Sequence, residues 1–290
     1  MRFGITILPE HPWSRAQVLW QQAEGYGFDH GWTYDHVTWA GLPDSPWFSA
    51  TTTLTAASTV TGLMRLGMFV ASPNFRHPGA FLREITALDD ISGGRFLLGL
   101  GTGGDLDSRI LGGPELTVKQ RVDRFEEFAE VLDVLLTNDK VTHRGEYFTI
   151  DGLATAPGPR QRPRTPFIMA GNGPRSIRMA VSLGAGWVTT GVKGESQDDW
   201  WASLEQLSGR LDAALDKAGR DRWGFGRFLN LDAGQRYSLE SAALFEDMVG
   251  RAGELGFTDV ITHWPREKDV YVGSLDTLEQ VVADVIPKFR

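Results

Sequence analysis

The chain has 290 residues and no cysteine, with 41% hydrophobic and 23% charged side chains and a formal net charge of −8. The lack of cysteine excludes disulfide scaffolds, thiolate metal sites and thiol catalysis, and the acidic balance argues against nucleic acid as the main partner. No apolar run reaches the roughly 18 residues that span a membrane, and the chain opens on a strand-like stretch rather than a secretory signal. We therefore expect a cytoplasmic protein that forms one domain over residues 1–290.

Short apolar runs alternate with segments of helical period along the first half of the chain. Four strands are predicted, over residues 3–8, 28–34, 66–71 and 95–101. Ser14-x-x-Gln17 is typical of a capping box that opens the first helix. Pro78 suits the first turn of a later helix, and Thr117-x-x-Gln120 predicts a second capping box. Each strand is thus followed by a helical segment.

The second half continues the alternation. Four more strands are predicted, over residues 167–170, 186–190, 225–231 and 259–263. Helices follow from Pro174, over residues 200–215 and 238–255, and from Ser274. Eight strand–helix units whose strands are continuously apolar predict a parallel α/β fold, a closed (β/α)8 TIM barrel, with an open doubly wound sheet as the alternative.

Two connections are longer than plain loops. Residues 102–116 follow the fourth strand, and residues 138–165 precede the fifth. Long loops of this kind are usually functional. We predict that both insertions cover the barrel mouth.

The segments that follow the strands are the expected positions of reactive groups in such a barrel. Gly171-Asn172-Gly173-Pro174 has the clearest chemistry, because glycines free the backbone amides and proline starts a helix whose N-terminus carries partial positive charge. This arrangement predicts a phosphate site. Arg175 and Arg178 could add positive charge to it.

A block of the first half carries a resemblance to a known family. It contains Arg65-Leu66-Gly67, Arg76-His77-Pro78 and the run from Leu88 to Gly101. This block resembles the luciferase-like monooxygenase superfamily. Weaker matches at Gly27-Phe28-Asp29, Asp35-His36, Pro166 to Gly173 and Gly186-Trp187 extend the resemblance over the first two-thirds of the chain, whereas the last third matches only in its strand–helix rhythm.

The resemblance implies a barrel that holds FMN or the deazaflavin coenzyme F420 at its mouth. The aspartate before the histidine in Asp35-His36 resembles the pattern of the deazaflavin-using members of the family. F420 is therefore the expected cofactor, and FMN is the alternative. His36 matches the histidine that exchanges a proton with the substrate, work for which an imidazole is suited. The cofactor-binding residues implied by the resemblance are Asp35, Val70, Ala71, Ser72, Thr102, Gly103, Asp107, Gly171, Asn172 and Gly173.

Two further features come from the resemblance. The family has a non-prolyl cis peptide at the end of the third strand, expected here within residues 69–72. Gly104 stands where the family's sugar-phosphate dehydrogenases have a catalytic glutamate, which argues against a glucose-6-phosphate type of activity. A homodimer is also implied.

The sequence therefore predicts an oxidoreductase that moves a hydride between F420 and a small organic substrate, with His36 as the proton-transfer residue. An FMN-dependent monooxygenase and a cofactor-binding barrel without turnover remain alternatives. A barrel glycosidase would need two facing carboxylates, for which Asp105 or Asp107 with Asp232 could be considered. No spacing of histidine and carboxylates resembles a metal site. Neither the substrate nor the direction of hydride transfer follows from the residues.

Overall fold

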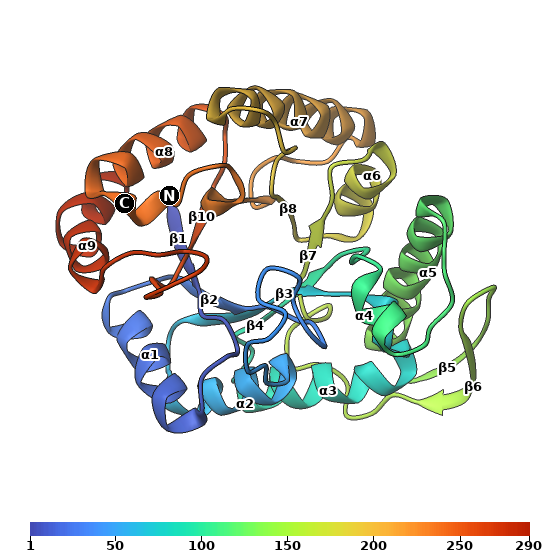
Figure 1. Cartoon of the computed structure of the whole chain (residues 1–290). Helices are drawn as coiled ribbons and strands as arrows, with labels where there is room; N and C mark the ends of the chain where they lie inside the picture. The colour runs from blue at the N-terminus through green and yellow to red at the C-terminus, as the bar shows by residue number, and fades with distance from the viewer.

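The chain forms a closed barrel of eight parallel strands inside a ring of helices (Figure 1), as seen in a computed structural model that describes residues 1–290. The strands are β1 (Arg2–Thr6), β2 (His30–Thr33), β3 (Arg65–Ala71), β4 (Phe96–Leu100), β7 (Phe167–Ala170), β8 (Gly186–Thr189), β9 (Gly226–Asn230) and β10 (Asp259–His263). β1 pairs with both β2 and β10. This closure confirms the predicted barrel and excludes the open sheet.

The helices cover the barrel with their apolar faces. They are α1 (Trp13–Gly25), α2 (Ala50–Val60), α3 (Pro78–Ile91), α4 (Leu106–Ile110), α5 (Val118–Thr137), α6 (Pro174–Leu183), α7 (Gln197–Ala218), α8 (Ala242–Glu254) and α9 (Leu275–Gln280). After α9 the chain continues helically to Phe289. The two ends of the chain meet, since the amino group of Met1 donates to the carbonyl of Phe289 at 2.9 Å.

The helix start signals were correct at four positions and wrong at two. Pro78 and Pro174 are the first residues of α3 and α6, as predicted. Thr117 forms the expected capping box with Gln120, and Ser274 caps α9. The box expected at Ser14 is wrong, because α1 begins at Trp13 after an extended Pro12. The helix expected from residue 238 begins instead at Ala242, after a 3-10 turn, and Ser241 caps it.

The two insertions lie in different places, the first at the mouth of the barrel and the second outside the ring of helices. Residues 102–116 follow β4 at the mouth and contain α4. Residues 138–165 contain a hairpin of β5 (Lys140–Arg144) and β6 (Thr149–Ala154) that lies outside the ring beside α3 and α5 (Figure 1). The prediction that this second insertion covers the mouth is wrong, because it packs Phe148 against Phe128 of α5 and then returns to the start of β7.

Aromatic side chains fill the interior of the barrel. The inner core consists of Leu8, Trp32, Tyr34, Leu42, Phe69, Leu97, Ile168, Val188, Phe228 and Ile261. Trp32 is fully buried at its centre. Gly67 of β3 makes room for its indole, because a Cβ on Gly67 would lie 2.1 Å from Cε3 of Trp32.

Gly67→Ala is expected to lower the free energy of unfolding by about 1–3 kcal/mol, the usual cost of overpacking a filled core. The indole of Trp32 cannot move away easily because its Nε1 donates to His30. Urea denaturation measures the change. Gly250→Ala in α8 is the matched control, since a Cβ there meets nothing within 4 Å and alanine should stabilise the helix by about 0.5–1 kcal/mol. Equal stability of Gly67→Ala and the parent protein would refute the close approach.

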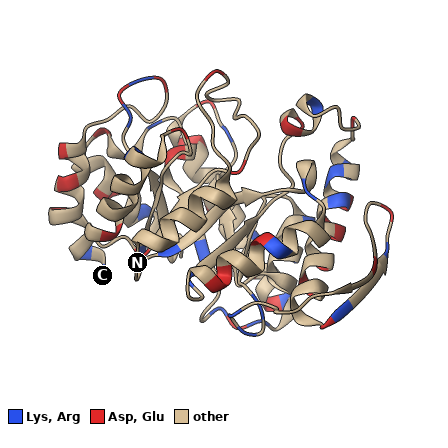
Figure 2. Cartoon of the chain, turned by 90° about the horizontal axis from the view of Figure 1, so that it is seen from below, with Lys and Arg blue, Asp and Glu red and all other residues tan.

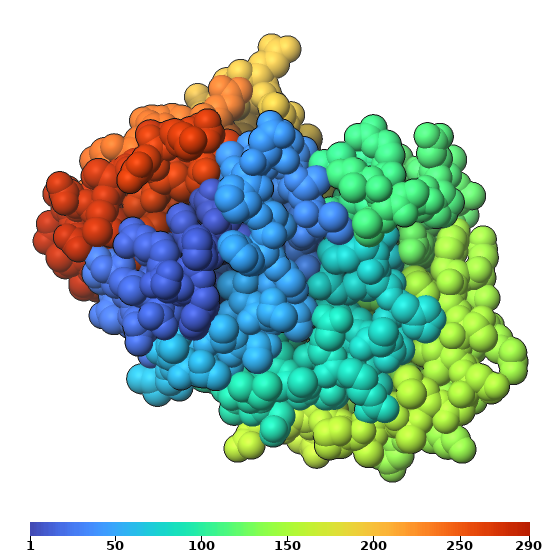
Figure 3. Space-filling view, turned by 60° about the horizontal axis from the view of Figure 1, so that its bottom comes forward, coloured from blue at the N-terminus to red at the C-terminus, as the bar shows by residue number.

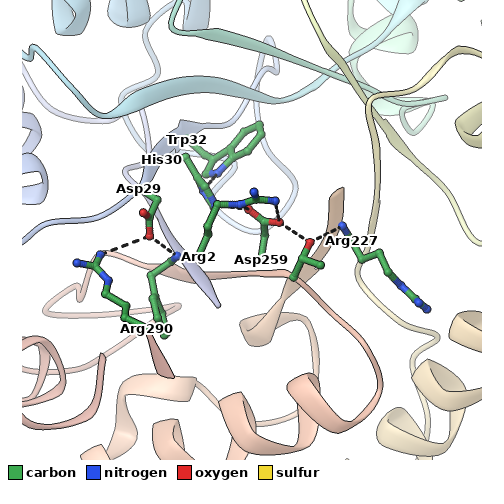
Figure 4. Close-up of polar contacts among 9 residues, drawn as sticks. Arg2, Asp29, His30, Trp32, Arg227, Asp259 and Arg290 are labelled. Atoms are coloured by element: carbon green, nitrogen blue, oxygen red, sulfur yellow. Dashed lines mark hydrogen bonds and ion pairs between the residues drawn. The ribbon is translucent and has the colours of Figure 1, made fainter. Parts of the chain in front are cut away.

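A polar network lies at the amino ends of the strands, which form the floor of the barrel (Figure 4). Arg2 donates to both carboxylate oxygens of Asp259, at 2.7 and 2.6 Å. The same carboxylate lies 3.1 Å from Nε2 of His30, whose Nδ1 accepts from the indole of Trp32 at 2.6 Å. An indole N–H only donates, so His30 carries its proton on Nε2 and donates it to Asp259.

Charged side chains of both signs are scattered over the outer helices and loops, and the strands are mostly free of them (Figure 2). No stripe of one sign runs along the face in this view. None of the helices combines the length and the apolar character that crossing a bilayer requires.

Candidate active site

A cavity of about 460 Å³ opens at the carboxyl ends of the strands, within the usual range for small-molecule sites. The ends of six strands and the segments that follow them line it, which is where the fold predicts reactive groups. The sequence-predicted residues in its wall are His36, Val70, Ser72, Thr102, Gly103, Gly171 and Asn172. The blue segment after β2 lies between the red C-terminal segment and the green one around α4 (Figure 3). Residues far apart in the sequence therefore meet around one cavity.

Four sequence-predicted residues are not part of the cavity wall: Asp35, Ala71, Asp107 and Gly173. Asp35 is buried and forms a bidentate ion pair with Arg76. Burial raises the pKa of the Asp35 carboxyl, although the Arg76 guanidinium opposes the shift. Asp35 thus holds the segment after β2 against the segment after β3.

His36 and Asp107 form a hydrogen-bonded pair at the cavity. Nδ1 of His36 lies 2.8 Å from Oδ2 of Asp107, and Oδ1 of Asp107 accepts the backbone N–H of Val37 at 2.7 Å. Burial alone would raise the pKa of Asp107, but these hydrogen bonds hold it below its usual value. The carboxylate therefore accepts the Nδ1 proton of His36 and leaves Nε2 as the free basic nitrogen. The His36 side chain remains 27% exposed, so a bound molecule can reach it.

The end of β3 forms one side of the cavity. Its Phe69–Val70 peptide is cis, which confirms the expectation of a non-prolyl cis bond in residues 69–72. Phe69 and Val70 line the cavity, whereas Ala71 is fully buried. Beside the end of β3, Gly103 has a φ of +68°, and a Cβ on it would lie 2.4 Å from Nδ2 of Asn74. Only glycine fits here, and its backbone is bare toward the cavity.

The turn before α6 presents free backbone donors. No acceptor within the protein takes the N–H of Asn172 or Gly173. The side chain of Asn172 holds the turn in place, because it accepts from Thr189 Oγ1 and donates to the carbonyl of Gly191, both at 2.7 Å. Arg175 is not available to this turn, because it pairs with Asp123 and Glu126 of α5.

Sequence reasoning missed several residues of the wall, above all Tyr34, Trp39 and Asn230. Tyr34 lies two residues before His36, and alternate residues of an extended segment share a face. That spacing was the available signal. Trp39 belongs to no predicted element, and Asn230 comes from the last third of the chain, where the resemblance is weak.

The cavity wall contains no lysine, arginine, aspartate or glutamate. Asp105 lines a separate, smaller pocket, and Asp107 faces His36. Asp232 is buried and bonded to His263. No two of these carboxylates face one another across the cavity, so the structure argues against the glycosidase alternative.

Comparison with known proteins identifies relatives of this chain. The family model described as luciferase-like monooxygenase matches residues 1–227. A 5,10-methylenetetrahydromethanopterin reductase of Archaeoglobus fulgidus is 27% identical over 227 residues, covering 78% of this chain and 61% of the relative. An F420-dependent glucose-6-phosphate dehydrogenase of Microbacterium testaceum is 30% identical over 208 residues, covering 69% of this chain and 58% of the relative. The matches thus span less than two-thirds of either relative's length.

A solved structure of an F420-dependent secondary alcohol dehydrogenase with an F420-acetone adduct superposes with a TM-score of 0.83 at 18% identity, covering 100% of this chain and 99% of that one. At this identity the likeness supports the fold.

Proposed function

Because the chain belongs to the luciferase-like monooxygenase family, we propose that it is an oxidoreductase that transfers a hydride between coenzyme F420 and a small organic substrate. The observation that carries the proposal is the pairing of His36 with Asp107 at the edge of a cavity otherwise walled by backbone and uncharged side chains. The names of the curated relatives support F420 as the cofactor. FMN is the alternative cofactor of the same cavity.

The wall of the cavity fits a planar ring with a polar tail. The end of β3 and the bare backbone at Gly103 offer flat surfaces to a ring. The unpaired amides of Asn172 and Gly173, at the start of α6, offer donors to a phosphate. A bound deazaflavin would supply the hydride acceptor or donor. The protein's own part is to orient the substrate, exclude water and exchange a proton at Nε2 of His36.

The substrate proposed here is small and uncharged. The cavity wall has no lysine or arginine to hold a phosphate or carboxylate of the substrate. Gly104 lines the cavity without a carboxylate of its own. We therefore propose an alcohol or carbonyl compound rather than the sugar phosphate named for one of the relatives.

The test of this function is a binding titration of the purified protein with F420 and with FMN, followed by assay of small uncharged alcohols and ketones. Tight binding of F420 and its reduction by an alcohol support the proposal. Tight binding of FMN alone favours the monooxygenase, and F420 binding without turnover favours a carrier. Binding of neither cofactor overturns all three.

Gly173→Val is expected to weaken cofactor binding by about 1–3 kcal/mol, the range for a blocked buried hydrogen-bond site. The valine should not disturb the fold, because a Cβ on Gly173 meets nothing within 4 Å and its φ is −76°. Titration of the folded variant measures the loss. Gly62→Val, at a similarly open position far from the cavity, should bind as the parent does. Unchanged affinity of Gly173→Val would place the phosphate elsewhere.

We also propose a homodimer located in the cytoplasm, as the family resemblance and the lack of cysteine lead us to expect. Sedimentation of the purified protein tests the first of these. That nucleic acid is not a partner stays a prediction.

A further inference from the structure

A second hydrogen-bonded chain ends at the same cavity, on the side away from Asp107. It joins Asp232, which follows β9, to His263 at the end of β10, and His263 to Tyr34, which follows β2. Oδ2 of Asp232 lies 2.7 Å from Nδ1 of His263, and Nε2 of His263 lies 2.8 Å from the Tyr34 hydroxyl. His263 is fully buried, and Tyr34 lines the cavity beside His36.

The positions of the protons follow from the partners of Asp232. Its Oδ2 also accepts the backbone N–H of His263 at 2.7 Å, and its Oδ1 accepts the N–H of Ser238 at 2.8 Å. Backbone N–H groups can only donate hydrogen bonds, so each oxygen of Asp232 must act as an acceptor. This favours the ionised carboxylate over the protonated acid. His263 therefore carries its proton on Nδ1, and its bare Nε2 accepts the proton of the Tyr34 hydroxyl.

The Tyr34 oxygen keeps its lone pairs for other donors. Tyr271 lies 3.2 Å from it, and the Tyr271 ring stacks on His263 with centroids 3.7 Å apart. Burial raises the pKa of Tyr34 well above its usual value, so this residue is a neutral phenol rather than a phenolate base. It can accept a proton only by passing its own to Nε2.

We propose that Tyr34 is a second proton-transfer residue of this cavity, with His263 and Asp232 as its positioning residues. A substrate hydroxyl gives its proton to the Tyr34 oxygen while the Tyr34 proton moves to Nε2 of His263. One substrate O–H bond breaks and one tyrosine O–H forms, and one tyrosine O–H breaks and one N–H forms. Two protons move in concert, so that the net transfer is one proton from the substrate to His263 with no change in oxidation state, and the new imidazolium lies against the Asp232 carboxylate. In the opposite direction the same groups protonate a carbonyl oxygen as it is reduced.

This inference rests on the proposed function, because the substrate must transfer its hydride to F420 as it gives up its proton. Two proton routes then serve one cavity. The pair of His36 and Asp107 is partly exposed and can exchange protons with water, whereas Tyr34 is 7% exposed and exchanges through His263. The buried route keeps a proton acceptor available when a bound molecule shields the cavity from solvent.

The first test uses the protein without cofactor. Nitrogen-15 NMR of labelled histidines should show His263 as the neutral tautomer with the proton on Nδ1, assigned by its disappearance in His263→Gln. The titratable groups that face His263 are Asp232, Tyr34 and Tyr271. Tyr34→Phe should shift the Nε2 resonance and leave the tautomer unchanged. A proton found on Nε2 in the parent protein overturns the proposal, whatever the protein binds.

The second test uses the protein loaded with F420 and a small uncharged alcohol that the protein oxidises. Tyr34→Phe should bind F420 with unchanged affinity and lose about 10²-fold in kcat, near the low end for general acid–base catalysis. Tyr237→Phe is the matched control, because its hydroxyl also contacts His263 but only at the backbone carbonyl, at 2.6 Å; it should retain parental kcat. Parental kcat in Tyr34→Phe overturns the relay alone, whereas failure of the parent protein to bind F420 overturns the proposed function and the relay with it.

Discussion

His36→Ala is expected to lose roughly 10²–10⁴-fold in turnover, the usual span for general acid–base catalysis. The variant should fold normally and bind the cofactor, because the His36 side chain is 27% exposed and its one polar contact is with Asp107. Steady-state kinetics, with cofactor binding measured separately, checks both expectations.

The controls separate proton transfer from simple packing. His143→Ala makes the same chemical change on the β5–β6 hairpin, where the imidazole contacts Glu127 away from the cavity, and should retain parental turnover. Asp107→Asn should lower turnover in the same direction as His36→Ala, because an amide that donates to Nδ1 would move the His36 proton onto Nε2. If His36→Ala keeps near-parental turnover, the proton goes to Tyr34 and His263 instead, and His36 is only part of the wall.

Local sequence signals predicted the barrel because each strand and helix has its own apolar pattern. The eight apolar runs lie within a few residues of the eight strands, and Thr117 begins α5 as predicted. The failures at Ser14 and at residue 238 have a shared cause. A capping pattern reports only local preference, whereas the backbone at Pro12 and the 3-10 turn at Ser238–Glu240 set where the helix starts.

The position of the second insertion could not be predicted from its length. In a barrel of strand–helix units, a helix leads the chain from the mouth back to the floor. Whatever follows α5 therefore emerges away from the mouth, which places the β5–β6 hairpin on the outer surface. A long connection after a strand is therefore expected at the mouth of the barrel, whereas a long connection after a helix is expected away from it.

The sequence predicted which strand-end residues line the cavity, but not which side chains hydrogen-bond to one another. The strand-end residues His36, Thr102 and Asn172 do meet at one cavity. The roles of the buried carboxylates depend on contacts between residues 71 and 31 positions apart in the sequence, His36 with Asp107 and Asp232 with His263. No local pattern encodes such pairs. Asp107 was expected to contact the cofactor; in the structure it is not part of the cavity wall and is bonded to His36, and its contact with a cofactor stays a prediction.

The second large effect is expected at the floor of the barrel, where Asp259→Ala should lower the free energy of unfolding by about 1–3 kcal/mol, the usual cost of leaving a buried hydrogen-bonding group without its partner. The Arg2 side chain is 56% exposed, so its charge regains water when the carboxylate is removed. The Asp259 side chain is 1% exposed, and it accepts from Arg2, His30 and Thr258 (Figure 4). The substitution leaves the Nε2–H of His30 buried without an acceptor, because Nδ1 of that ring is already bonded to Trp32. Urea denaturation at neutral pH measures the loss.

The same carboxylate predicts how the loss depends on pH. Burial alone would raise the pKa of Asp259, but the hydrogen bonds from Arg2 and His30 lower it to about 2. A group whose pKa is lower in the folded state stabilises that state above its unfolded pKa of about 3.9 and loses this contribution as pH falls toward the folded value. The difference between the parent and Asp259→Asn should therefore be constant from about pH 7 to 5 and shrink below about pH 4.

Asp151→Asn on the β5–β6 hairpin is the control for this pH dependence. The Asp151 side chain is 81% exposed, so the same substitution there should change the free energy of unfolding little at any of these pH values. Because the network lies at the opposite end of the barrel from the cavity, where residues serve stability rather than chemistry, folded Asp259→Asn should bind cofactor and turn over as the parent does. A stability difference that persists unchanged at pH 3 would mean that the packing of the amide, and not the lost charge, accounts for the effect. Reduced cofactor affinity in the folded variant would mean that the floor and the mouth are coupled through Trp32, whose ring lies 5.6 Å from that of Phe69 in the cavity wall.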